Sequence, residues 1–382
     1  MTYKRCRLRS LILEQIERGD IGVGDQLPTE SQMVRQYGMS RATVREGIAL
    51  LVQEGILARR RGAGTFVRSR KPHNGNKLLA AIVASQPGGW DNFGQVVHEI
   101  EARVHEQGYS LIVCNHESSR EKTQAHLQRI IEQRVGGVIF SPIQLPGFTD
   151  FNLQVVQTLE DKGIPFVLIA SPISGESLCR YSFVSSNGFA ATREIVRHLA
   201  GLGHRRIAYI RGLPEVFSAD QRFSGFCEEM KRQNLDMPDG YIRQIEVGPV
   251  EDQGRREVRE LLAQSPSPSA VVCIHDSVAR NVIEEVQSMG LSVPADLAVV
   301  GFDDLYFAAE LNPPLTTVRT PLPDEAAMDV AILFKKINGT LTGERQEFLP
   351  CELVIRESCG APPKLRASKI IRAASPAVAT PL

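Results

Sequence analysis

The sequence lacks long apolar runs and paired cysteines. Its longest uninterrupted apolar run, residues 78–84, has seven residues, whereas a membrane-spanning helix needs about 20. No apolar signal segment follows Met1, so we expect a cytoplasmic protein without a membrane partner. The seven cysteines are scattered and form no C-x-x-C pair, which favours reduced packing residues over a disulfide framework.

Motifs of common enzymes are also absent. No segment fits the phosphate-loop pattern GxxxxGK[ST], the metalloprotease pattern H-E-x-x-H or the nucleophile pattern G-x-S-x-G. The three G-x-G segments, at 22–24, 62–64 and 201–203, lack the third glycine of a dinucleotide-binding loop. We therefore expect no enzyme activity, no cofactor and no metal site.

The formal net charge of zero hides an uneven distribution of charge. Residues 1–71 contain 14 basic and 7 acidic residues, so this part carries +7 and the remaining chain carries −7. A basic module on an acidic body favours a polyanionic partner for the small part, because phosphates attract lysine and arginine. The alternative is a basic face that is only solvated.

The first fifty residues predict three helices. Apolar residues recur at helical spacing over 3–18 and over 41–52. Between these stretches, Thr29 and Gln32 have the spacing of a capping box, which predicts the start of a second helix. After a tight turn, Ser40 can cap the third helix.

A basic hairpin is expected after the third helix. Strand-like residues at 56–58 and 65–67 flank the basic, glycine-rich segment 59–64. Three helices followed by a hairpin make a winged helix-turn-helix domain, which we place at residues 1–68. In such a domain the third helix enters the major groove, and the hairpin tip contacts the flanking groove or backbone. We therefore expect double-stranded DNA as the partner.

This region resembles the gluconate-repressor (GntR) type of DNA-binding domain over about 65 residues, chiefly in the segment LPTESQMVRQYGMSRATVREGIALLVQEGILARRRGAGTFV. The resemblance implies that Arg41 and Arg45 read bases. The further DNA contacts that it implies, to phosphates or from the wing, are Lys4, Ser31, Ser40, Thr43, Arg61 and Gly62. One departure is Gly47, where the family commonly has alanine; a glycine inside a helix costs about 0.5 to 1 kcal/mol relative to alanine.

The remaining chain predicts an α/β body behind a linker. Residues 69–77 are polar and lack apolar periodicity, as a linker does. Over 78–360, short apolar strands alternate with amphipathic helices, which predicts a doubly wound parallel-sheet domain with two similar lobes. A ligand is expected at the carboxyl ends of the strands, in the cleft between the lobes. Residues 361–382, rich in alanine, proline and serine, are expected to be disordered.

Segments of this body resemble, in order, the lactose/galactose-repressor (LacI/GalR) effector domain, which is itself similar to periplasmic sugar-binding proteins. These segments are GHRRIAYI, RFSGF, VPADLAVVGFDD, PPLTTV and LPCELVIRES. The resemblance implies a ligand-binding pocket in which Arg222 and Asp303 are the main polar contacts. It also implies that Trp90 and Phe93 lie in the region that supplies an aromatic wall.

Three further positions bear on the effector. Asp276 matches the resemblance, whereas His275 stands where asparagine is usual and Asn187 where aspartate is common. We expect all three in the pocket. The two changes leave open a sugar with different hydroxyl stereochemistry, a sugar acid or a non-sugar. His275 could also be a core histidine with satisfied hydrogen bonds.

Structural interpretations of the other pocket residues stay open as well. Arg222 could pair with a carboxylate on its own helix, such as Asp220 or Glu229. Asp303 could cap a loop, and Trp90 could pack a loop instead of contacting a ligand.

Together these features predict a sequence-specific transcriptional regulator, expected to be a repressor, whose operator binding is controlled by a small molecule, expected to be a sugar. The plan resembles that of arabinose repressors. We expect a homodimer on a pseudo-palindromic operator, in which ligand closing the cleft changes the spacing of the two DNA-binding heads. Two alternatives remain: a large domain that only dimerises, and a DNA-tethered enzyme acting on a small metabolite.

Overall fold

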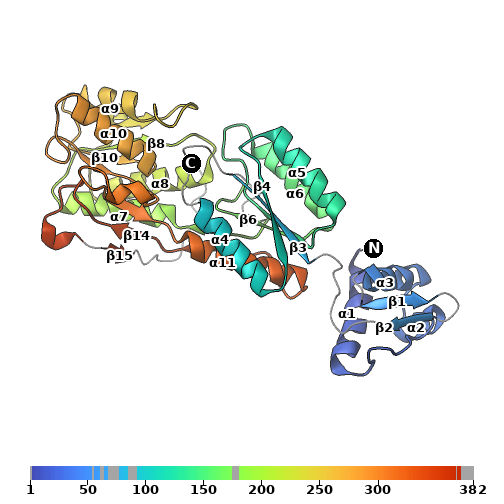
Figure 1. Cartoon of the computed structure of the whole chain (residues 1–382). Helices are drawn as coiled ribbons and strands as arrows, with labels where there is room; N and C mark the ends of the chain where they lie inside the picture. Colours follow the sequence, from blue (N-terminus) through green and yellow to red (C-terminus); the bar gives the residue numbers. More distant parts are fainter. Residues whose placement is uncertain are drawn as a thin grey trace. The chain divides into compact units, whose positions relative to one another are not determined.

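The computed structural model describes residues 2–53, 56–60, 64–67, 77–84, 93–173, 180–366 and 368–370 (Figure 1). The chain divides into two compact units, residues 1–77 and 78–382. Within the described ranges, no helix is both long and apolar enough to cross a membrane. The five cysteines whose surroundings are described are free, as the sequence predicts: Cys114, Cys227, Cys273, Cys351 and Cys359.

The N-terminal unit is a winged helix-turn-helix, which confirms the prediction. Its elements are α1 (Thr2–Arg18), α2 (Glu30–Tyr37), α3 (Arg41–Gln53) and the antiparallel hairpin of β1 (Leu57–Arg60) and β2 (Gly64–Val67). They enclose a core of Leu8, Ile12, Ile16, Leu27, Met33, Val44, Ile48, Leu51, Ile56, Leu57 and Val67. Backbone hydrogen bonds also join residues 24–27 to β2, an addition to the hairpin that the sequence pattern does not reveal.

Caps define the turn between α2 and α3. The backbone N–H of Gln32 donates to Thr29 Oγ1 at 3.4 Å, and the N–H of Thr29 donates to Gln32 Oε1 at 2.7 Å, so the predicted capping box is present. Helix α2 ends at Gly38, whose φ of 62° is the left-handed conformation that glycine tolerates. The N–H of Thr43 then donates to Ser40 Oγ at 3.2 Å, which caps α3 as predicted.

Close packing between α1 and α3 explains the glycine at position 47. A Cβ at this position would lie 2.8 Å from Leu8 Cδ2 and 3.2 Å from Leu8 Cβ. Leu8 belongs to α1 and is fully buried. The glycine therefore allows α1 to pack closely on α3.

The C-terminal unit contains two parallel sheets with helices on both faces, which confirms the doubly wound architecture (Figure 1). The first lobe has the strand order β13-β7-β6-β5-β3-β4. Its strands are β3 (Leu78–Val83), β4 (Ser110–Asn115), β5 (Gly137–Phe140), β6 (Phe166–Ile169), β7 (Phe183–Ser186) and β13 (Gln346–Leu349). Helices α5 (Arg120–Gln133) and α6 (Thr149–Asp161) pack on one face, and α4 (Phe93–Glu106) and α11 (Leu322–Ile337) pack on the other.

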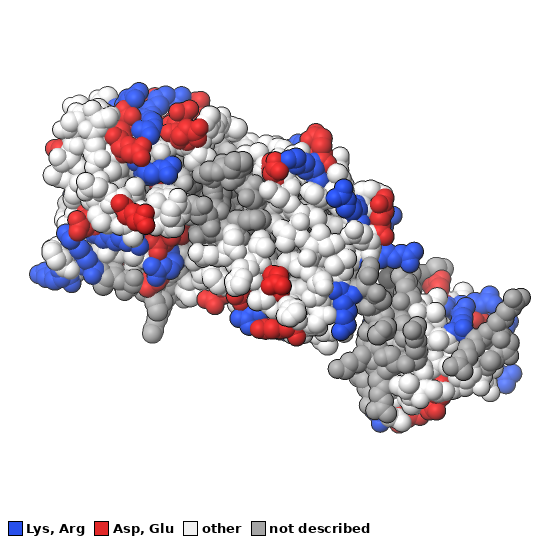
Figure 2. All heavy atoms as spheres, viewed as in Figure 1, with Lys and Arg blue, Asp and Glu red and all other residues white. Residues whose placement is uncertain are grey.

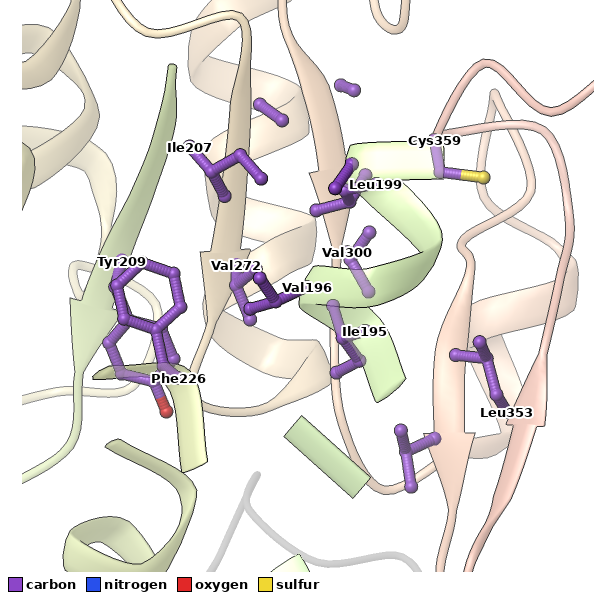
Figure 3. Close-up of a cluster of buried hydrophobic side chains, with 14 of the residues drawn as sticks. Ile195, Val196, Leu199, Ile207, Tyr209, Phe226, Val272, Val300, Leu353 and Cys359 are labelled. Atoms are coloured by element: carbon purple, nitrogen blue, oxygen red, sulfur yellow. The ribbon is translucent and has the colours of Figure 1, made fainter. Parts of the chain in front are cut away.

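The second lobe has the strand order β11-β10-β8-β9. Its strands are β8 (Ile207–Arg211), β9 (Ile242–Gln244), β10 (Ala270–Cys273) and β11 (Ala298–Val300). Helices α7 (Gly188–Gly201) and α8 (Phe217–Arg232) pack on one face, and α9 (Arg255–Leu262) and α10 (Asp276–Ser288) pack on the other. Figure 3 shows the first of these cores, in which Ile195, Val196 and Leu199 of α7 lie against the strands.

Charges on the second lobe are paired locally. Figure 2 shows basic and acidic side chains intermingled over α9 and α10. Arg259 Nε lies 2.6 Å from Glu285 Oε1, and Arg256 Nη2 lies 3.0 Å from Glu246 Oε1. This face therefore presents no patch of one sign.

The chain passes between the lobes three times. Asn187 joins β7 to α7, Thr320 and Pro321 join β12 (Thr317–Arg319) to α11, and Pro350 and Cys351 join β13 to β14 (Glu352–Val354). The N–H of Asn187 donates to the carbonyl oxygen of Leu349 at 2.9 Å, so the first and third crossings lie side by side. Segments that cross between lobes can act as a hinge about which one lobe rotates against the other.

Among the described residues, a hydrogen bond and a group of aromatic rings also join the lobes. The N–H of Gly147, which follows β5, donates to Glu215 Oε2 at 2.8 Å. The ring of Phe217 at the start of α8 packs on Phe183 and Phe348 of the first sheet, with centroids 6.4 and 6.2 Å apart.

The prediction of a disordered tail over 361–382 is wrong for the first residues of this segment. Ala361 is buried, residues Pro363–Leu365 form a 3-10 turn, and β15 (Ser368–Ile370) pairs antiparallel with β14. Pairing with a distant strand stabilises this segment, and local composition does not reveal such a partner. Residues 371–382 lie outside the described residues.

Candidate functional site

The start of α3 presents two exposed arginines. The side chains of Arg41 and Arg45 are 68% and 66% exposed and lie four residues apart, on one side of the helix. Their Nε atoms lie 3.9 and 3.0 Å from Glu30 Oε2, and Arg59 of the wing lies 3.7 Å from Glu30 Oε1. Exposed ion pairs of this kind contribute little to stability.

Sequence reasoning did not identify Glu30. The residue stands in the first turn of α2, where an acidic residue is favourable for the helix dipole alone. Only the packing of α2 against α3 brings its carboxylate among three arginines.

The structure describes only some of the other residues that are predicted to contact DNA. Ser31 and Ser40 are exposed, and Ser40 Oγ lies 2.8 Å from Thr43 Oγ1. Lys4 belongs to α1, but its side chain lies outside the described part of the structure. Arg61 and Gly62 also lie outside the described residues.

A buried ion pair joins two predicted effector contacts. Arg222 Nη2 donates to Asp303 Oδ1 at 2.9 Å, and the two side chains are 7% and 5% exposed. Arg222 Nη1 also donates to the carbonyl oxygen of Ile274 at 2.6 Å, and the guanidinium carbon lies 3.7 Å from the centroid of the Phe302 ring. These contacts fix the guanidinium beside the carboxyl ends of β10 and β11.

The carboxylates on the helix of Arg222 have other partners. Asp220 lies 3.8 Å from Arg211, and Glu229 lies 3.0 Å from Arg193. The pairing within α8 that the sequence left open is therefore not found.

Two glycines make room for this arrangement. A Cβ at Gly225 of α8 would lie 2.2 Å from the backbone oxygen of Phe189, so only glycine permits α7 and α8 to approach so closely. A Cβ at Gly301 would lie 2.2 Å from Asp276 Oδ1. The loop that follows Gly301 carries Asp303, whose φ is 103°.

Asp276 uses both carboxyl oxygens within the fold. Its Oδ2 accepts a hydrogen bond from the N–H of Leu305 at 2.7 Å, and its Oδ1 accepts one from Thr317 Oγ1 at 2.6 Å. Burial raises the pKa of this carboxyl well above its ordinary value. In this structure Asp276 positions the loop that carries Asp303.

His275 and Asn187 both cap helices. The N–H of Val278 donates to His275 Nδ1 at 3.3 Å, so the neutral ring carries its proton on Nε2. Burial lowers the pKa of His275 to about 4; nearby Asp303 opposes this shift and Arg222 adds to it. At the first crossing, Asn187 Oδ1 accepts from the N–H of Ala190 at 2.9 Å.

The two side chains of the predicted aromatic wall lie outside the described part of the structure. Phe93 begins α4, but its side chain is not among the described ones. Trp90 lies outside the described residues. Within the described ranges, no group of three histidine, cysteine, aspartate or glutamate side chains is arranged to hold a metal ion.

Comparison with known proteins assigns the two units. Residues 5–67 match the gntR family of bacterial regulatory proteins, and residues 196–359 match the periplasmic binding protein-like domain. The arabinose metabolism transcriptional repressor of Geobacillus stearothermophilus is 27% identical over 360 residues, which cover 93% of this chain and 97% of that protein. The HTH-type transcriptional repressor PurR of Histophilus somni is 29% identical over 268 residues, which cover 70% and 77%. These relatives are repressors, not enzymes.

Solved structures agree with this assignment. A regulatory protein of the LacI family from Chloroflexus aggregans is 26% identical with a TM-score of 0.64, and the match covers 74% of this chain and 97% of that one. The transcriptional regulator CelR in complex with cellobiose is 22% identical with a TM-score of 0.66 over 87% of this chain and all of that one, which shows a shared fold. The chain therefore joins a DNA-binding domain of the gntR family of bacterial regulatory proteins to a periplasmic binding protein-like domain of the LacI type.

Proposed function

We propose that this chain is a transcriptional repressor whose binding to an operator is controlled by a sugar held at Arg222 and Asp303. The buried pair of these two side chains is the observation that carries the proposal. It lies at the carboxyl ends of parallel strands, where doubly wound sheets bind their ligands. His275, which caps the next helix beside the Ile274 carbonyl, belongs to the same site.

The chemistry of this pair suits hydroxyl groups. A fixed guanidinium offers several N–H donors in one plane, and a carboxylate accepts from adjacent hydroxyls. Because the two groups already orient each other, little side-chain entropy is lost when a polyol replaces water beside them. The similarity to an arabinose metabolism repressor over both units makes arabinose the first sugar to test.

The hinge supplies a route from the sugar to DNA. A sugar that binds one arrangement of the lobes more tightly shifts the equilibrium toward it. The Gly147–Glu215 hydrogen bond and the Phe217 ring contacts join the lobes, so lobe rotation would change both. In a homodimer on a pseudo-palindromic operator, the rotation would alter the spacing of the two α3 helices, whose Arg41 and Arg45 read bases.

Two measurements on the full chain test the proposal. A thermal-shift screen against neutral sugars, arabinose first, is expected to show stabilisation by at least one. Selection from random DNA is expected to yield a pseudo-palindromic site whose affinity changes when that sugar is added. No stabilisation by any sugar would favour a body that only dimerises, and conversion of the bound sugar to a product would favour a DNA-tethered enzyme.

A further inference from the structure

Unpartnered buried oxygens gather at the start of α11. Among the described residues, four buried side-chain atoms lack a hydrogen-bond partner, and three of them are Thr320 Oγ1, Glu325 Oε1 and Asp329 Oδ2. Folded proteins leave few buried polar atoms unpaired, because each one loses its bonds to water. An unpaired buried oxygen of this kind is a position at which another molecule can supply the missing hydrogen bond.

Glu325 connects this cluster to the site of the proposed effector. It is 2% exposed, and the side chain of Ser186, the last residue of β7, lies close enough to lower the pKa of its carboxyl. It also lies close enough to Asp303 and Arg222 for their charges to act on its carboxyl. Glu325 on the first lobe therefore lies near the Arg222–Asp303 pair of the second lobe.

Positive charge is scarce around this carboxyl. Arg222 is already paired with Asp303, and Asp324 on α11 adds negative charge beside Glu325. Burial, with Asp303 as the next cause, raises the pKa of Glu325 to about 8. At neutral pH the carboxyl therefore keeps its proton and can donate as well as accept a hydrogen bond.

We propose that Glu325 is a specificity-determining residue of the effector site, whose unpartnered oxygen bonds a hydroxyl group of an uncharged effector. This inference rests on the proposed function. It selects among the effectors that the sequence left open. A sugar acid would bring a negative charge into a buried site where Arg222 is already paired with Asp303, and an unpaired buried charge is costly. Asp329, one turn further along α11, uses Oδ1 to accept from the N–H of Val184 and lies deeper in the fold.

The test uses matched pairs of sugars on the full chain. Galactose and galacturonate, and glucose and glucuronate, are titrated into the wild type by calorimetry after a thermal-shift screen, with arabinose as a further neutral sugar. The wild type is expected to bind the neutral member of at least one pair, and at least tenfold more tightly than its acid. An acid that binds as tightly as its neutral partner would overturn the inference.

Variants at Glu325 separate binding from folding. Glu325→Leu is expected to weaken binding of the neutral sugar at least tenfold. The unfolding temperature of the free protein is expected to stay unchanged or rise, because a buried carboxyl with an unpaired oxygen is removed. Glu325→Gln keeps a hydrogen-bonding group and is expected to bind the sugar within about threefold of the wild type. Asp324→Asn, which removes the neighbouring exposed charge, is the matched control and should bind as the wild type does.

The outcomes distinguish the inference from the function on which it rests. If no sugar of either kind binds the wild type, the proposed sugar response fails. If the neutral sugar binds the wild type and Glu325→Leu equally well, only the role of Glu325 fails. A lower unfolding temperature for both Glu325 variants with unchanged sugar affinity would show that the side chain is structural and would also overturn the inference. Should Glu325→Leu not fold, Glu325→Ala takes its place: binding of the neutral sugar that is at least tenfold weaker would support the inference, and unchanged binding would refute it.

Discussion

Breaking the Arg222–Asp303 pair should cost more stability than removing it whole. The side chains are 7% and 5% exposed and their atoms lie 2.9 Å apart, so either single change leaves an uncompensated charge in the interior. Losses of about 3 to 5 kcal/mol are typical for such changes. Arg222→Met also leaves the Ile274 carbonyl without its donor, which adds about 1 kcal/mol or more.

The double variant Arg222→Met/Asp303→Asn removes both charges. Asparagine is chosen because φ at Asp303 is 103°, a region that asparagine tolerates better than most residues. We expect the double variant to be more stable than the sum of the single losses predicts, by about 2 kcal/mol or more. Urea unfolding of the full chain, followed by circular dichroism, measures this difference as a double-mutant cycle.

The same variants separate stability from response. All three should lose the effect of the sugar on operator binding, although the double variant stays folded. Additive losses of stability would refute a coupled buried pair. A double variant that still responds to the sugar would refute the assignment of these residues to the effector site.

Three further predictions concern other parts of the molecule. Arg41→Ala or Arg45→Ala should cost about 1 to 3 kcal/mol of discrimination between operator and random DNA, as measured by fluorescence anisotropy, with Arg18→Ala at the far end of α1 as the control; equal losses on both DNAs would argue against base reading. Gly47→Ala should destabilise the N-terminal unit by about 1 kcal/mol, because a clash of about 1 to 3 kcal/mol with Leu8 outweighs the gain in helix propensity; a more heat-stable variant would contradict the close packing. Between pH 4.5 and about 8 the folded chain keeps a proton on Glu325 that the unfolded chain releases, so stability falls as the pH rises, and Glu325→Gln should flatten this part of the curve of unfolding free energy against pH.

Local signals explain why the N-terminal unit was predictable. The bonds between Thr29 and Gln32 and between Ser40 and Thr43 span three residues, so spacing in the sequence is enough to find them. Gly38 ends α2 because glycine tolerates the left-handed conformation, and this property can be read from the residue type alone. Glu30 was missed because its contact with Arg45 spans fifteen residues and depends on how two helices pack.

In the effector site, too, the sequence does not reveal contacts between residues that are far apart along the chain. The family resemblance pointed to Arg222 and Asp303, but they are 81 residues apart, and nothing in either segment indicates that they pair with each other. Asp276 matched the resemblance as well, yet its two oxygens are bound within the fold. Glu325 was missed because an acidic residue in the first turn of a helix is ordinarily exposed. Its burial follows from the packing of α11 against β7.

The central claim is that a sugar in the C-terminal unit controls DNA binding by the N-terminal unit. The most direct test is the affinity of the full chain for its selected operator, measured by fluorescence anisotropy with and without a saturating sugar that calorimetry shows to bind. We predict that the sugar weakens operator binding at least tenfold in the wild type and has no effect in Arg222→Met/Asp303→Asn. Unchanged operator affinity in a wild type that demonstrably binds the sugar would contradict the account.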